Sequence, residues 1–88
     1  MSKITAPFTE AQVAILNRYQ LCGIMHPFTC GTAGCRMPLI ATIHGWECAY
    51  CQYTQGWAHE WMADEEIVAR LEIHRGILDI AAQRDSLE

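Results

Sequence analysis

The chain has 88 residues, of which 51% are hydrophobic and 18% charged, and its formal net charge is −4. This length excludes two separate apolar cores, and the composition excludes a disordered chain. A core this small usually needs a metal or disulfides to stabilise it, and five cysteines are present. We therefore expect one metal-stabilised α+β domain over residues 1–88.

The first predicted element is a helix over about residues 10–22. Thr9 can cap the amide of Gln12, whose side chain can reach back to Thr9. Gly23 is a natural C-terminal stop. Cys22 lies on the apolar face of this helix, so we expect a buried core residue rather than a metal ligand.

The middle of the chain, about residues 26–57, has no helical periodicity and several glycines. The run 39–44 contains two isoleucines and a threonine, and residues 46–48 can pair with it around a turn at Gly45. A further short strand is predicted near 53–55. This pattern predicts a short antiparallel hairpin.

Two close-spaced cysteine pairs flank that hairpin, and twelve residues separate them. They are Cys30 with Cys35, and Cys48 with Cys51. In each pair a turn can direct two thiolates to one point, which is the arrangement that tetrahedral Zn²⁺ requires. The sequence therefore predicts a zinc ribbon with two knuckles, which binds one structural Zn²⁺.

Two histidines compete for the place of the fourth ligand. His26 precedes Cys30 by three intervening residues, and His44 lies at the hairpin turn. Either could replace Cys35, because histidine is an ordinary zinc ligand. Four protein ligands leave no open position for water or substrate, so we do not expect an enzyme.

Aromatic residues crowd the segment from Trp46 to Trp61. Large side chains here should close the gap between ribbon and helices. Tyr50, inside the second knuckle, and Tyr53 are instead candidates for contact with a partner, since an exposed aromatic can fill a pocket or stack on a base.

A second helix is predicted over about residues 64–84, with Asp64 at its start. One apolar stripe at helical spacing should cover the core; it comprises Ile67, Leu71, His74, Leu78 and Ala81. A second stripe comprises Ile73, Ile77 and Ile80. Either the first helix covers this second stripe, or a second copy of the chain does so in a homodimer.

The motifs HPFTC (26–30) and GWECAYCQYTQGWAH (45–59) resemble small uncharacterised zinc-ribbon proteins of bacteriophages. The resemblance covers about a third of the chain. It implies a phage origin and supports Cys30, Cys48 and Cys51 as ligands. Cys35 falls in the variable insert, so the fourth ligand stays open.

These observations favour a non-catalytic binding module that acts through protein–protein interaction, possible targets being a host protein or a host defence complex that it inhibits. The alternative is a zinc ribbon that binds single-stranded nucleic acid or takes part in transcription. Only six Lys and Arg residues are present, which disfavours nucleic acid. The residues MSKITAPFTEAQ lack a signal-peptide core and no apolar run could span a bilayer, so we expect no membrane partner and a cytoplasmic location.

Overall fold

The computed structural model describes the backbone of residues 2–87 and the side chains of residues 2–81. It is a small α+β structure of two helices and short antiparallel strands, as the sequence predicts. In chain order its elements are β1 (Lys3–Thr5), α1 (Glu10–Cys22), β2 (Ile40–Thr42), β3 (Gly45–Glu47), β4 (Thr54–Gln55), β5 (Trp57–His59), the 3₁₀ helix η1 (Glu60–Ala63) and α2 (Glu65–Leu87).

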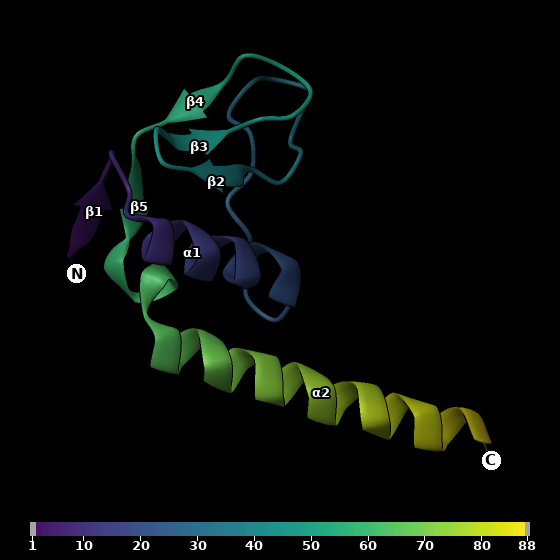
Figure 1. The fold of residues 1–88 in the computed structure, drawn as a ribbon. Coiled ribbons are helices and arrows are strands. Elements are labelled where there is room, and N and C mark those ends of the chain that lie inside the picture. Colours follow the sequence, from purple (N-terminus) through teal and green to yellow (C-terminus); the bar gives the residue numbers. More distant parts are fainter. Residues whose placement is uncertain (1, 88) are drawn as a thin grey trace.

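The elements stack in three tiers (Figure 1). The three-stranded sheet, in the order β2-β3-β4, forms the first tier, and α1 lies between this sheet and α2. A second, two-stranded sheet of β1 and β5 closes the side of the molecule near the start of α1. The long loop between α1 and β2 carries the first cysteine pair away from the helices and next to the sheet.

The predicted boundaries of α1 are confirmed, because its local signals act as the sequence suggests. The Gln12 amide donates to Thr9 Oγ1 at 3.1 Å, and the Thr9 amide donates to Gln12 Oε1 at 2.9 Å. Gly23 ends the helix in the left-handed conformation, with φ of 77°. Cys22 is buried, as expected.

The hairpin is confirmed as well. β2 pairs with β3 in the register Ala41↔Trp46, and β4 adds to the far side of β3 with Trp46 opposite Gln55. Gly45 has φ of 122°, and an added Cβ there would lie 2.8 Å from the Gln55 carbonyl oxygen. Only glycine fits this position without displacing the backbone of β4.

The pairing of β1 with β5 was not predicted. It joins residues more than fifty positions apart, in the register Ile4↔Ala58. The Ala6 amide extends the contact by donating to the Gly56 carbonyl at 2.9 Å. The N-terminal strand therefore fastens the segment that leads from the sheet into α2.

The core lies between the three-stranded sheet, α1 and η1. Its fully buried large side chains come from five different segments and are Trp46, Leu16, Leu39, Met62 and Val68. Complete burial of an aliphatic side chain contributes about 1.5–3 kcal/mol. Sheet and helices are therefore held together by one shared apolar cluster.

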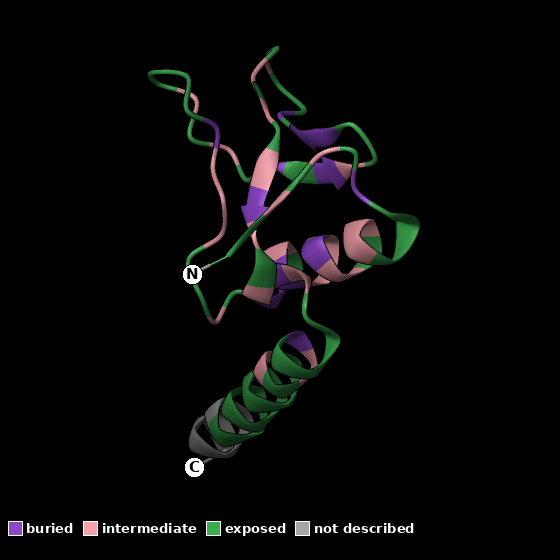
Figure 2. Cartoon of the chain, turned by 90° about the vertical axis from the view of Figure 1, so that its left-hand side faces the viewer, coloured by how far each residue is buried: buried purple, intermediate pink, exposed green. Residues whose placement is uncertain are grey.

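The predicted core-facing stripe of α2 is wrong in most positions. Val68, which lies outside that stripe, is the fully buried residue, and Leu71 is half-buried. The other members, Ile67, His74, Leu78 and Ala81, are exposed. The reason is geometric: α2 contacts the body only along its first turns and then extends beyond it (Figures 1 and 2).

No described helix combines the length and apolar character needed to cross a bilayer.

Candidate metal centre

Four cysteine sulfurs gather at one point beside the three-stranded sheet. The Sγ atoms of Cys30, Cys35, Cys48 and Cys51 all lie within 4.8 Å of one another. The closest pairs join the two knuckles: Cys30 to Cys51 is 3.2 Å, and Cys35 to Cys48 is 3.6 Å. No other group of three or more potential ligands of this kind occurs among the described residues.

These separations fit a tetrahedral metal site. A Zn–S bond of about 2.3 Å places the sulfurs of a ZnS₄ tetrahedron about 3.8 Å apart. The sulfurs of Cys51 and Cys35 are 4.0 Å apart, and the two shorter pairs lie slightly inside the tetrahedral value. A metal at the centre therefore requires only small side-chain adjustments.

The first knuckle stands on a backbone hairpin. The Cys30 amide donates to the Met37 carbonyl at 2.8 Å, and the Leu39 amide donates to the Phe28 carbonyl at 2.9 Å. The side chain of Gln20, on α1, holds the base of this hairpin. Its Nε2 donates to the carbonyls of Phe28 and Leu39, both at 2.8 Å, and its Oε1 accepts from the Phe28 amide at 2.9 Å.

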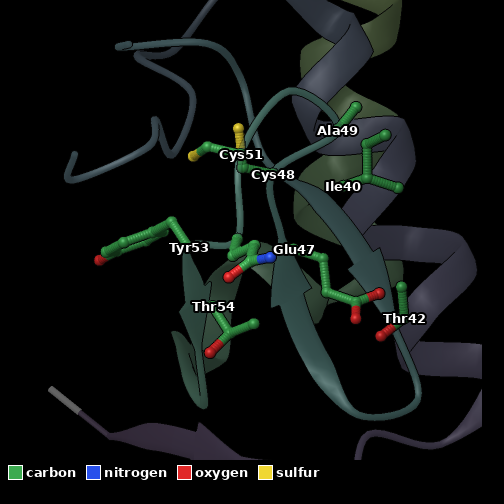
Figure 3. A pocket seen from close by; sticks show the side chains of 9 residues that line it. Ile40, Thr42, Glu47, Cys48, Ala49, Cys51, Tyr53 and Thr54 are labelled. Carbon is green, nitrogen blue, oxygen red and sulfur yellow. The ribbon is translucent and has the colours of Figure 1, made fainter. Parts of the chain in front are cut away.

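The second knuckle is the turn between β3 and β4. The Cys48 amide donates to the Tyr53 carbonyl at 3.1 Å, which closes the turn directly on the sheet. Figure 3 shows the Cys48 and Cys51 sulfurs next to each other on this turn. The second knuckle is thus fixed by a short hairpin, whereas the first depends on contacts with α1.

Backbone amides in both turns point at sulfur. The Thr32 amide donates to Cys30 Sγ at 3.4 Å, and the Tyr50 amide donates to Cys48 Sγ at 3.5 Å. Thr32 also brings its hydroxyl to 3.6 Å from Cys51 Sγ. Donors of this kind stabilise the negative charge of metal-bound thiolates and orient the ligands.

The sulfurs of the cluster differ in acidity. Hydrogen bonds from the Tyr53 amide first, and then from the Thr32 hydroxyl, lower the pKa of Cys51 to about 6. At Cys35 the largest single influence, the Met37 amide, lowers the pKa, but burial and hydrogen bonds with the other three sulfurs outweigh it and raise the pKa to about 12. Closely spaced thiolates repel one another, so a divalent cation is needed before all four can be deprotonated together.

The two histidines considered as alternative ligands lie outside the described cysteine cluster. His26 is exposed, and its Nδ1 lies 3.0 Å from the Pro27 carbonyl oxygen. His44 is exposed in the turn between β2 and β3. The cluster that the structure brings together contains Cys35 instead.

The two predicted partner-binding tyrosines differ in their surroundings. Tyr50 projects from the second knuckle with 74% of its surface exposed. Tyr53 is half-buried: its ring lies against Gly31, and its hydroxyl donates to Gln55 Oε1 at 3.1 Å. Tyr53 therefore has a packing contact that links the two knuckles, and its predicted contact with a partner stays a prediction.

An open hollow of about 460 Å³ lies next to the second knuckle. Glu47 is the only acidic side chain in its lining, which also contains Ile40, Thr42, Cys48, Ala49, Cys51, Gln52, Tyr53 and Thr54 (Figure 3). A single exposed carboxylate provides no paired acid and base.

The predicted aromatic packing between the cysteine-rich segment and the helices is present. Phe28 lies at its centre, with ring centroids 5.3 Å from Trp46, 5.4 Å from Trp57 and 5.7 Å from His59. Trp61 packs edge-on against Tyr19 at 5.4 Å. His59 belongs to this aromatic cluster, and its Nδ1 is buried without a hydrogen-bond partner among the described residues.

The chain matches no protein-family model, no curated protein and no solved structure in comparisons with each. The case for a metal site therefore depends on the residues themselves.

Sequence reasoning missed the side chains that support the cysteines. Gln20 and Thr32 were not singled out, and only Thr32 has a signal in the sequence. Thr32 follows a ligand by two positions, where an amide can reach sulfur. Gln20 is a polar residue on the side of α1 that faces Phe28 and Leu39, and the sequence alone does not reveal that this segment approaches it.

Proposed function

We propose that Cys30, Cys35, Cys48 and Cys51 bind one Zn²⁺ as a closed structural site, and that the chain is a non-catalytic module that binds another protein. The observation that carries the metal assignment is the convergence of four sulfurs within 4.8 Å. Zinc is the metal we favour because four thiolates in tetrahedral arrangement are a common structural zinc set.

The closed ligand set supports a role without catalysis. Catalytic zinc keeps one coordination position for water or substrate, and four cysteines fill all four positions. The neighbouring hollow offers a single carboxylate, that of Glu47. Both features favour a site that stabilises the fold.

A surface beside α2 supports binding to a protein. Its hollow has a volume of about 340 Å³ and is lined by Met25, Trp61, Ile67 and Leu71. Met25 and Ile67 are exposed, so an apolar anchor from a partner could bury them. The sequence motif resembles phage zinc ribbons, and we therefore propose a host protein as the partner, whose activity the complex inhibits.

A matched pair of variants tests the binding proposal. Ile67→Glu places a charge in the apolar hollow, and Ile43→Glu makes the same change on an exposed residue of the β2–β3 turn. In pull-downs from bacterial lysate at low and moderate salt, we expect a stoichiometric host protein with wild type and Ile43→Glu, and its loss with Ile67→Glu. Recovery of no such protein with wild type, or equal recovery with both variants, would contradict the proposal.

Binding of single-stranded nucleic acid is the second candidate, because Tyr50 is exposed on the turn between β3 and β4 and could stack on a base. The charges around Tyr50 do not favour binding to phosphates, because between residues 26 and 59 the only Lys or Arg is Arg36. A mobility-shift titration with a single-stranded oligonucleotide separates the candidates. Binding that weakens steeply with salt and is lost in Tyr50→Ala would favour nucleic acid.

A further inference from the structure

Three isoleucines of α2 form a stripe that faces away from the body of the protein. Ile73, Ile77 and Ile80 are 65%, 60% and 58% exposed. At about 100° per residue they fall within about 60° of helical arc, and Val68, buried against the body, lies roughly opposite them. The isoleucine stripe is therefore open along its length. Beyond its first turns α2 extends clear of the body, so the body does not obstruct a second helix placed there (Figure 2).

We propose that a second copy of this chain covers the isoleucine stripe, with the two α2 helices parallel about a two-fold axis. The spacing of four and then three residues places the isoleucines at successive core positions of a heptad repeat. In a parallel pair each isoleucine meets its own counterpart. In the antiparallel register that pairs Ile73 with Ile77, Ile80 instead faces Arg70.

Three small residues flank the stripe. Ala69 and Gly76 lie on one side of it and Ala81 on the other. A Cβ added at Gly76 would meet nothing within 4 Å, so the isolated chain has no packing requirement for glycine at this position. Small flanking residues allow another helix to approach the isoleucines closely.

The charges near the stripe are compatible with a copy of the same face. Arg70 and Glu66, which lie in line with the stripe toward the start of α2, pair with each other at 2.8 Å, whereas Arg75 and Asp79 lie on the side of Val68, away from the stripe. Two copies can therefore meet here without bringing unpaired like charges together, although each chain has a formal charge of −4. A face that is apolar, narrow and locally neutral is complementary to itself.

Arg70 favours two helices over three or more. It lies in line with the stripe, one heptad before Ile77. In a two-stranded arrangement its guanidinium can extend past the seam into water, whereas a third helix would enclose it.

Sedimentation of the full, metal-loaded chain over the micromolar range tests this proposal. Wild type should shift from the 10.0 kDa chain mass to twice that mass as concentration rises. Ile77→Glu should weaken the association by at least about tenfold. Leu21→Glu, which alters an 87% exposed residue of α1, should associate like wild type. Metal content and circular dichroism report whether each variant folds, and Ile80→Ser serves in place of Ile77→Glu if that variant does not.

Three sedimentation results would overturn the proposal. Wild type could keep the mass of one chain at every concentration. Its mass at high concentration could instead reach that of three chains or more. Leu21→Glu could also weaken association as much as Ile77→Glu does. A photo-crosslinker at position 80 tests the orientation. Attachment to the partner near residue 80 supports the parallel pair, and attachment near residue 70 contradicts it.

Discussion

The side chain of Asn17 hydrogen-bonds to both backbone groups of Ala41, as a neighbouring strand would. Its Oδ1 accepts the Ala41 amide at 2.8 Å, and its Nδ2 donates to the Ala41 carbonyl at 3.1 Å. Ala41 lies in β2, the edge strand that packs on α1, and it is buried. One side chain thus satisfies both backbone groups of a buried edge residue and fixes α1 against the sheet that bears the second knuckle.

Replacement of Asn17 by alanine should therefore destabilise the protein more than an ordinary surface change. Leaving a buried donor and acceptor without partners costs about 1–3 kcal/mol for each unsatisfied group. Urea unfolding of the metal-saturated protein measures the loss. Asn17→Asp, which keeps the acceptor and loses the donor, should fall between Asn17→Ala and wild type. Equal stability of Asn17→Ala and wild type would show that Ala41 is satisfied in another way.

At the first knuckle, Gly31 leaves room for the ring of Tyr53. An added Cβ would lie 2.8 Å from Tyr53 Cε2, so the tyrosine ring would have to move and would loosen the contact between the knuckles. We expect Gly31→Ala to lower metal affinity by about tenfold, an effect typical of residues that support metal ligands. Competition with a chromophoric chelator measures this affinity.

Gly56→Ala is the matched control, because a Cβ at Gly56 would meet nothing within 4 Å. Its metal affinity should equal that of wild type. A Gly31→Ala protein that also binds metal as wild type does would disprove the role assigned to the Tyr53 contact.

Single substitutions distinguish the four-cysteine ligand set from the sets in which His26 or His44 replaces Cys35. Cys35→Ala should weaken metal binding by more than about a hundredfold, beyond the range of supporting residues. Cys22→Ala should keep full metal binding, because Cys22 is a buried core residue of α1. His26→Ala and His44→Ala should keep full binding too. Metal titration of these four variants decides the fourth ligand. Loss of binding in either histidine variant, with retention in Cys35→Ala, would replace Cys35 in the site.

The ion pairs between α1 and α2 should make the free energy of unfolding depend on pH in the acid range. Hydrogen bonds from Arg18, and then its charge, lower the pKa of Glu72, and Arg18 also pairs with Glu65. Because the folded-state pKa is depressed, the stabilisation is complete above the ordinary glutamate pKa of about 4.3 and is lost as pH falls through the lower folded value.

Comparison of wild type with Glu72→Gln isolates this contribution, since acid release of metal affects both proteins. The stability difference between them should be constant near neutral pH and should shrink in acid below the ordinary glutamate pKa. A difference that grows as pH falls would have the wrong sign for a depressed pKa.

Local signals made the first helix and the hairpin predictable. The Thr9 and Gln12 side chains and Gly23 fix both ends of α1 without help from distant residues. The β2–β3 hairpin is likewise set by neighbouring β-branched residues and Gly45. In both cases the residues that decide the structure are close in sequence.

Distant contacts were not predictable in the same way. β1 has only three residues, too few to show a period, and its partner β5 lies more than fifty residues further along the chain. On α2 the apolar residues cover so wide an arc that periodicity could not decide which side contacts the body. Val68 is the buried residue because η1 packs on the body and so sets which side of α2 faces it. This is a tertiary contact.

The cysteine spacing predicted the candidate site well, but it did not predict its supports. The same four cysteines that the spacing indicates come together in the structure. Gln20, which holds the first knuckle by three hydrogen bonds, belongs to a helix that the sequence gives no reason to connect with the metal.

Metal content measured together with folding tests the account most directly. The purified chain, prepared under reducing conditions, should contain one zinc per chain by elemental mass spectrometry. Excess chelator should then remove the zinc and abolish the cooperative unfolding transition, because the four metal–thiolate bonds join the two knuckles. A chain that contains no stoichiometric metal and unfolds with the same cooperativity in chelator would contradict the account.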